Sequence, residues 1–104
     1  MDQGAAAHIE LSARAQRDLR RSGKGVARRL EETLGVHPLP RNADVVPLRG
    51  RSPWLRLRPG SYRVLFRPLT RRELDALGVD AEAGFPVARV VDRRELERAV
   101  AALR

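Results

Sequence analysis

The chain has 104 residues, 42% of them hydrophobic, and its 21 Lys and Arg against 13 Asp and Glu give a net charge of +8 at pH 7. This length and composition predict one domain, residues 1–104, with its own core, and exclude a disordered tail. The absence of cysteine excludes disulfides, cysteine metal sites and thiol nucleophiles. The excess of positive charge favours a polyanionic partner, with nucleic acid first.

Residues 1–11 have neither the basic nor the apolar region of a signal peptide, and no later stretch approaches about 20 uncharged apolar residues. We therefore expect a cytoplasmic protein without a membrane partner. His8 and His37 have no second ligand at a useful spacing, and no GxxxxGK[ST] loop is present. We expect no metal and no cofactor.

The first half of the chain predicts a strand followed by a helical hairpin. Residues 6–11 alternate as a short strand, and Ser12 is a suitable N-cap for a helix that ends near Ser22-Gly23. A second helix is predicted over 24–34, where apolar residues recur every four positions. Gly35 ends this second helix, and the Gly23-Lys24-Gly25 turn joins the pair.

The second half predicts strands, in an α+β domain whose small antiparallel sheet carries the N-terminal strand, the helical hairpin and a C-terminal helix. Proline-rich residues 35–44 are expected to be irregular. The further expected elements are a strand at 45–48, a loop at 49–53, a hairpin within 54–68 around Gly60-Ser61, a capped helix at 70–78, a strand at 85–91 and a helix at 93–103.

The hairpin within 54–68 separates two kinds of side chain. With Gly60-Ser61 as the loop, Leu57 lies opposite Val64, and Arg58 lies opposite Arg63. Because side chains alternate along a strand, one face is predicted to be apolar and the other basic. The apolar face holds Leu55, Leu57, Val64 and Phe66, and the outward, basic face holds Trp54, Arg56, Arg58, Arg63 and Arg67.

The basic face needs a compensating anion. Residues 41–67 contain seven Arg and one Asp, while acidic residues gather in 31–32 and 73–82. We therefore expect these arginines to lack local partners and to bind phosphate. The alternative interpretation is a solvated outer face with no such role. Trp54 can either stack on a base or pack under the 49–53 loop.

Two segments carry a resemblance to a known family: PLRGRSPWLRLRPGSYRVLFRPL at 47–69 and VARVVDRRELERAV at 87–100. With the helical hairpin before them, they resemble the RelE/ParE superfamily of type II toxin–antitoxin toxins over residues 9–100. The Gly-x-Tyr-Arg-Val turn and the late Val-x-x-Arg-Arg stretch are typical of that superfamily. The resemblance implies a toxin held in a hetero-oligomer by a RelB- or Phd-like antitoxin.

The resemblance implies two activities. RelE-like members are metal-independent endoribonucleases that cut mRNA on the ribosome and so stop translation, whereas ParE-like members inhibit DNA gyrase. The first is our leading expectation, and a catalytically inactive RNA-binding domain is a further alternative. By resemblance, Arg63 stabilises the cleaved phosphate. The catalytic positions implied are Arg56, Arg58, Arg63 and Arg93, and the further expected RNA contacts are Trp54, Arg49, Arg51, Arg67, Arg89 and Arg94.

The chain departs from the family pattern at two positions. Val91-Asp92 stands where many active members have Gly-His or Gly-Lys, and Glu97 stands where they have a tyrosine. RNA cleavage needs a proton acceptor, and arginine is a poor one because its pKa lies above about 12. Asp92, Glu95 and Glu97 are the carboxylate candidates, although such acids also commonly cap or begin a helix. We expect Tyr62 to belong to the core face or the hairpin tip.

Overall fold

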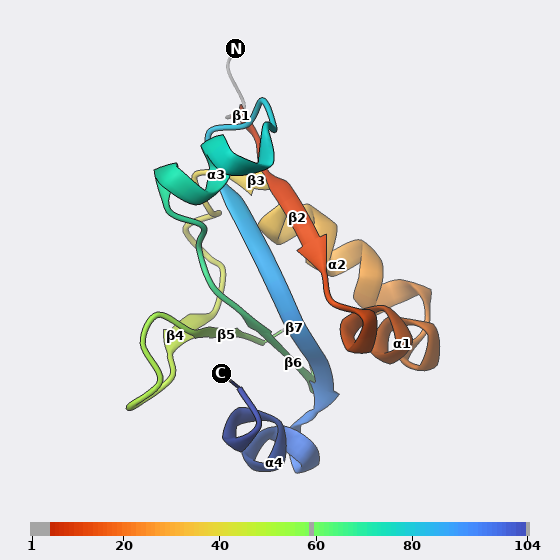
Figure 1. Cartoon of the computed structure of the whole chain (residues 1–104). Coiled ribbons are helices and arrows are strands. Elements are labelled where there is room, and N and C mark those ends of the chain that lie inside the picture. Colours follow the sequence, from red (N-terminus) through yellow and green to blue (C-terminus); the bar gives the residue numbers. More distant parts are fainter. Residues whose placement is uncertain (1–4, 59, 104) are drawn as a thin grey trace.

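A five-stranded mixed sheet forms the centre of the computed structural model, which describes residues 5–58 and 60–103 (Figure 1). The order of its strands is β2-β7-β6-β5-β4, and β1 pairs with β3 in a separate two-stranded sheet. The strands are β1 (Ala5–Ala6), β2 (His8–Leu11), β3 (Val36–His37), β4 (Val45–Pro47), β5 (Leu55–Leu57), β6 (Tyr62–Phe66) and β7 (Gly84–Asp92). The helices are α1 (Ala13–Ser22), α2 (Lys24–Leu34), α3 (Arg71–Leu77), the 3₁₀ turn η1 (Arg93–Glu95) and α4 (Leu96–Ala101).

This arrangement confirms an α+β fold but corrects the expected antiparallel sheet. Strand β2 runs parallel to β7, with Ile9 opposite Phe85 and Leu11 opposite Val87. In this direction β2 leads directly into α1, which packs against β7. The strand expected at 6–11 is also divided, because β1 ends at Ala6 and pairs with β3 in the segment that was expected to be irregular.

The helical hairpin is confirmed in its main features. Ser12 caps α1, since its hydroxyl accepts a hydrogen bond from the Ala15 N–H at 2.9 Å. The same hydroxyl donates to the Ala88 carbonyl at 2.7 Å, which ties the start of α1 to β7. Helix α2 ends at Leu34 before Gly35, as expected. It begins directly after Gly23, whose φ of +93° favours glycine, so the connection is shorter than the predicted three-residue turn.

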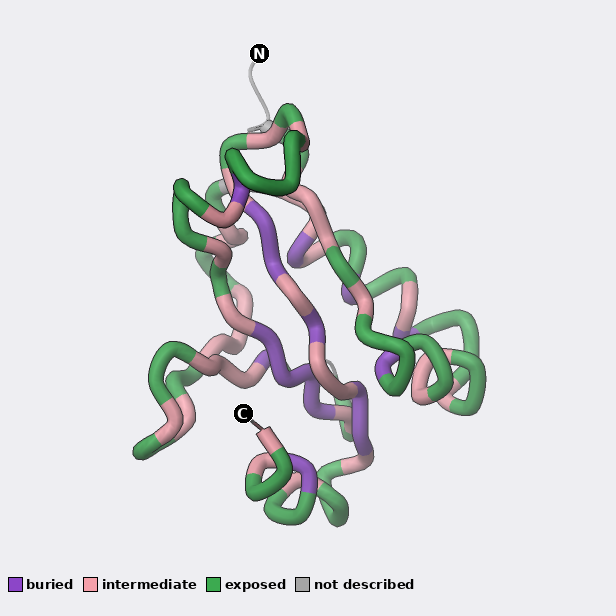
Figure 2. The backbone as a smooth tube through the Cα atoms, in the orientation of Figure 1, coloured by how far each residue is buried: buried purple, intermediate pink, exposed green. Residues whose placement is uncertain are grey.

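The main core lies between the helical hairpin and one face of the sheet (Figure 2). Phe66 is fully buried there, and its ring meets Phe85 edge-to-face with centroids 5.6 Å apart. The predicted register of the β5–β6 hairpin is confirmed, with Leu55 opposite Phe66 and Leu57 opposite Val64. Other buried members of this core are Ala15, Val26, Leu30, Leu34, Val87 and Val90.

A second, smaller core covers the opposite face of the sheet. Leu65 and Val91 are buried there against Ala99 of α4. Further apolar side chains from Leu48 and from α4 and its continuation complete the cluster. The basic face of the hairpin is therefore not open along its whole length, because alternation also places Leu65 on it and α4 covers that residue.

Candidate functional site

Arg63 is the buried cation of the sheet. The residue is 7% exposed, and its Nη1 donates to the carbonyls of Gly60 at 3.0 Å and Tyr62 at 2.8 Å. The expectation that Arg63 faces outward to solvent is wrong. Arg63 lies opposite Val91 in the β6–β7 ladder, on the face of the sheet that α4 covers.

Three arginines of the site act electrostatically on Arg63. Burial lowers the pKa of Arg63, and the positive charges of Arg58, Arg56 and Arg93 lower it further, while Asp44 acts in the opposite direction. Arginine nevertheless remains protonated in proteins. The structure thus brings together the four residues assigned as catalytic, from β5, the segment after it, β6 and η1. We call Arg56, Arg58, Arg63 and Arg93 the arginine cluster.

Arg58 has a partner that sequence reasoning missed. Its Nε donates to Oδ2 of Asp44 at 2.6 Å, and both side chains are partly exposed. Asp44 immediately precedes β4, the strand that pairs with β5. Since Asp44 also acts on the pKa of Arg63, one carboxylate sits among the cations of the cluster. The positive charge of the cluster is only partly compensated.

Arg67 is held by an ion pair that was also not expected. Its Nη1 and Nη2 donate to the two carboxylate oxygens of Glu73, each at 3.0 Å. Glu73 belongs to the capping box of α3, where it also accepts from the Thr70 N–H at 3.0 Å. The guanidinium of Arg67 lies 6.0 Å from the ring centroid of Trp54. Arg67 therefore joins Trp54, β6 and α3, which corrects the expectation that it lacks a local partner.

The Arg67–Glu73 pair predicts a stability that depends on pH. Hydrogen bonds from Arg67 and Thr70 lower the pKa of Glu73 from 4.5 to about 2. A carboxyl whose pKa is lower in the folded state stabilises the protein above its unfolded pKa and loses this contribution as the pH falls through its folded pKa. We expect the melting temperature to fall between pH 4.5 and about 2, and less steeply in Glu73→Gln than in the control Glu82→Gln. Equal slopes for the two variants in thermal melts would contradict the assignment.

Arg89 connects β7 to α1. Its Nε and Nη2 donate to Asp18 at 2.8 and 3.2 Å, and Asp18 also accepts from the Val90 N–H at 2.9 Å. Burial opposes ionisation of Asp18, but these hydrogen bonds outweigh it and lower its pKa; the same bonds raise the pKa of Arg89. Asp18 thereby accepts a hydrogen bond from a backbone N–H of β7 beyond the residues that pair with β2. Arg89, which was expected to contact RNA, is engaged in this half-buried ion pair.

The remaining expected RNA contacts lie at the surface around α4 and the 49–53 loop. Arg49 is exposed, and Arg51 is half-buried with its Nη1 3.4 Å from the Leu103 carbonyl. Arg94 is exposed and its Nε donates to Asp92 at 3.1 Å. Trp54 is half-buried beside Arg67. These residues are spread over the α4 side and one end of the sheet. Among the expected site residues, those of the arginine cluster are the ones that lie close together.

The carboxylates at the end of β7 serve the start of a helix. Oδ1 of Asp92 accepts from the Arg94 N–H at 2.9 Å, so Asp92 caps η1. That backbone hydrogen bond, with help from the Arg94 side chain, lowers the pKa of Asp92. Asp92 is thus an ionised capping residue, as the helix-start interpretation predicted. Glu95 and Glu97 are exposed, and Tyr62 packs against the main core, as expected.

Sequence reasoning also missed Arg29. Gly60 has a φ of +70°, and a Cβ built on it would lie 3.2 Å from Nη1 of Arg29, so the guanidinium from α2 rests over the hairpin turn. A cation from the helical hairpin thus lies beside the turn between β5 and β6. In the sequence, Arg29 is one of several arginines on an amphipathic helix, and no local pattern marks it as the one that reaches the turn.

A scan of the sequence against protein-family models found no match, and a search of curated proteins found none that is significantly similar. Across residues 5–58 and 60–103, no helix has the length and apolar character needed to cross a membrane. In the same part of the chain, no group of three or more His, Asp or Glu side chains is placed to hold a metal ion.

Proposed function

We propose that this chain is a RelE-type toxin of a type II toxin–antitoxin system, a cytoplasmic endoribonuclease that cleaves mRNA on the ribosome. The observation that carries the proposal is the arginine cluster, in which Arg56, Arg58 and Arg93 act on the buried Arg63, and Asp44, the ion-pair partner of Arg58, is the one carboxylate that acts on Arg63 with them. Cations crowded in this way are relieved by a bound anion, and RNA phosphate is the anion such a site fits. The choice of mRNA as the substrate rests on the sequence resemblance to RelE-like toxins.

The chemistry that the cluster supports is charge stabilisation. Cleavage by the 2′-hydroxyl builds negative charge on the scissile phosphate, and fixed donors aimed at that charge lower the barrier. Arg63 is such a donor, because burial and two backbone carbonyls fix its position before substrate arrives. In this proposal the arginines stabilise the phosphorane, and the ribosome orders the RNA for attack. Its partner would be an antitoxin that covers the cluster with acidic side chains.

A second candidate function is inhibition of DNA gyrase, as in ParE-like toxins. The observation that favours it is the engagement of Asp92 as a cap and Asp44 as an ion-pair partner. Neither carboxylate is then a ready proton acceptor, and gyrase inhibition requires none. The same surface would also suit an RNA-binding domain without cleavage.

Primer extension distinguishes these functions. It is run on mRNA from cells after induction of the chain, and on purified mRNA with ribosomes present or absent. We expect cuts within codons that require the ribosome, and their loss in Arg58→Ala. Arg72→Ala is the matched control, because Arg72 is an exposed arginine on α3 and lies outside the cluster. Intact mRNA together with arrested replication would support gyrase inhibition instead. Intact mRNA with normal replication would reject both toxin activities.

A further inference from the structure

Asp44 stands at the end of a row that crosses the sheet to the arginine cluster. The β4–β5 ladder continues to this residue, because the Arg58 N–H donates to the Asp44 carbonyl at 3.2 Å. Arg58 in turn adjoins Arg63, since the residues beside them, Leu57 and Val64, are paired across β5 and β6. Because neighbouring strands lie about 4.8 Å apart, the Asp44 backbone is about 10 Å from that of Arg63. The carboxylate is therefore placed to compete with a phosphate for these arginines.

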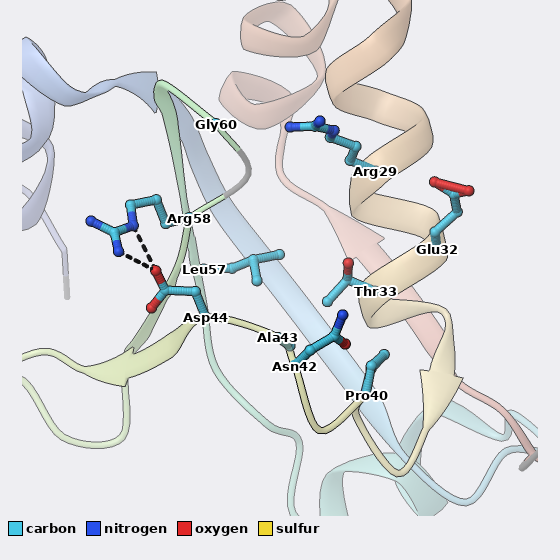
Figure 3. Close-up of a pocket in the computed structure, with 10 residues that line it drawn as sticks. All are labelled: Arg29, Glu32, Thr33, Pro40, Asn42, Ala43, Asp44, Leu57, Arg58 and Gly60. Atoms are coloured by element: carbon cyan, nitrogen blue, oxygen red, sulfur yellow. Dashed lines mark hydrogen bonds and ion pairs between the residues drawn. The ribbon is translucent and has the colours of Figure 1, made fainter.

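The ion pair between Asp44 and Arg58 occupies the edge of the guanidinium that a phosphate would use. Nε and Nη2 of Arg58 both lie against one carboxylate oxygen, Oδ2, with Nε at 2.6 Å. Two parallel N–H groups are the donors with which arginine binds a phosphate. Figure 3 shows the two side chains turned toward each other and away from α2. In the free protein Arg58 thus already holds an anion that belongs to the chain.

This ion pair is easier to exchange than the one between β7 and α1. The side chains of Arg58 and Asp44 are 49% and 37% exposed, whereas those of Arg89 and Asp18 are 17% and 11% exposed. Asp18 is also anchored by the Val90 N–H. Among the residues that the structure describes, no N–H outside Arg58 binds the Asp44 carboxylate. Exposed ion pairs of this kind contribute little to stability, so a phosphate can displace the carboxylate at small cost.

Asp44 also affects the buried member of the arginine cluster. Its negative charge raises the pKa of Arg63, against the lowering caused by burial and by the neighbouring arginines. In the absence of substrate, the carboxylate thus offsets part of the repulsion among the cations. A bound phosphate would do the same, and the two anions would repel each other if both stayed in place. They are therefore alternative partners of Arg58.

We propose that Asp44 is a specificity-determining residue that holds Arg58 in the free protein and is displaced from it by the phosphate of the substrate. This proposal rests on the proposed function and adds to it a reason for dependence on the ribosome. RNA that is free in solution must displace the carboxylate by its own affinity. The ribosome holds mRNA in place, which raises the effective concentration of the phosphate at the cluster. Asp44 thereby selects against free RNA.

Binding of a short single-stranded RNA to the free protein, measured by fluorescence anisotropy at low salt, tests this proposal. Asp44→Asn should bind about tenfold more tightly than the unsubstituted protein, which is the effect of one unit charge about 6 Å away at an effective dielectric constant of about 40. Asp44→Glu should bind as the unsubstituted protein does, because it restores the carboxylate. Equal or weaker binding by Asp44→Asn would overturn the proposal and leave ribosome-dependent cleavage untouched.

Asp75→Asn is the matched control. It removes the same charge from another exposed ion pair, the one that Asp75 forms with Arg71 on α3, outside the cluster. Because salt screens charges that lie far apart, its affinity for the RNA should change by less than about twofold. A gain as large as that of Asp44→Asn would show that net charge alone governs binding, and would overturn the proposal.

The gain in affinity should also depend on Arg58. In the Arg58→Ala background, Asp44→Asn should change the affinity by less than about threefold, because no guanidinium is left to release. The full gain in that background would show that Asp44 only repels RNA at a distance, and would contradict the exchange of partners.

The NMR signal of the Arg58 Nε–H gives a readout that needs no variant. It should shift when RNA is added, since its acceptor changes from a carboxylate to a phosphate, while the signal of the Arg89 Nε–H, bound to Asp18, should stay in place. Tighter binding by Asp44→Asn without cuts in mRNA on the ribosome would support the exchange and reject the nuclease. Failure of Asp44→Asn to bind RNA would overturn the exchange together with the phosphate site of the arginine cluster.

Discussion

Arg63→Ala should lower single-turnover cleavage of mRNA on programmed ribosomes by about 10²–10³-fold, the usual effect of removing one preorganised donor to a developing negative charge. The structure gives two reasons to choose this residue. It is the buried member of the arginine cluster, and two backbone carbonyls fix its guanidinium. The measurement is the cleavage rate with purified variant in excess over ribosomes.

The same substitution should also destabilise the protein, because Arg63 is buried. Removing its guanidinium leaves the Gly60 and Tyr62 carbonyls without those hydrogen bonds, at a cost of about 1–3 kcal/mol in the free energy of unfolding. Release of the repulsion from neighbouring arginines offsets part of this loss. Urea unfolding measures the net change, and the cleavage assay must be run where the variant is folded.

Val26→Ala separates the two effects, because it removes a buried group from the main core and leaves the arginine cluster intact. It should keep a normal cleavage rate under folding conditions. A comparable loss of cleavage in Val26→Ala would show that stability alone explains the result. Normal cleavage by Arg63→Ala would remove the arginine from the mechanism.

Leu65→Ala should lower the free energy of unfolding by about 2–5 kcal/mol, the range for truncating a fully buried leucine. Leu65 is 0% exposed, and the second core that it forms with Val91 and Ala99 holds α4 against the sheet. Leu57→Ala, on the main core, should lie in the same range. Urea unfolding monitored by circular dichroism measures both changes.

Leu77→Ala provides the surface control. Leu77 is 46% exposed on α3, so its truncation should change the free energy of unfolding by no more than about 0.5 kcal/mol. If Leu65→Ala were as mild as Leu77→Ala, α4 could not be packed on this face of the sheet. The enclosure of Arg63 would then lose its structural basis.

Local patterns account for the parts of the fold that sequence reasoning predicted. Alternation of side chains around Gly60-Ser61 placed Leu57 opposite Val64, and capping chemistry placed the start of α1 at Ser12. The parallel pairing of β2 with β7 has no such local signal. The burial of Arg63 was missed for a related reason: alternation gives the face on which a side chain lies, but not whether a distant helix covers that face.

The candidate site divides in the same way. The residues of the arginine cluster were chosen by family resemblance, and the structure places Arg56, Arg58 and Arg93 within electrostatic reach of Arg63. The ion-pair partners were not predicted. Asp44 and Asp18 lie 14 and 71 positions from the arginines they bind, and Glu73 pairs with Arg67 in addition to capping α3. Such pairs form only once the fold has placed their elements side by side.

The parallel pairing of β2 with β7 also bears on the order in which the protein folds. The β5–β6 pairing closes a short turn, and the β6–β7 pairing closes the longer connection over residues 67–83, which contains α3. The hydrogen bond from Ser12 to Ala88 spans 76 positions. The edge strand β2 can therefore pair with β7 only after the long segment between them has become compact. Contacts of such separation slow folding. Residues that hold α1 on β7, Asp18 among them, should therefore affect the rate of unfolding more than the rate of folding.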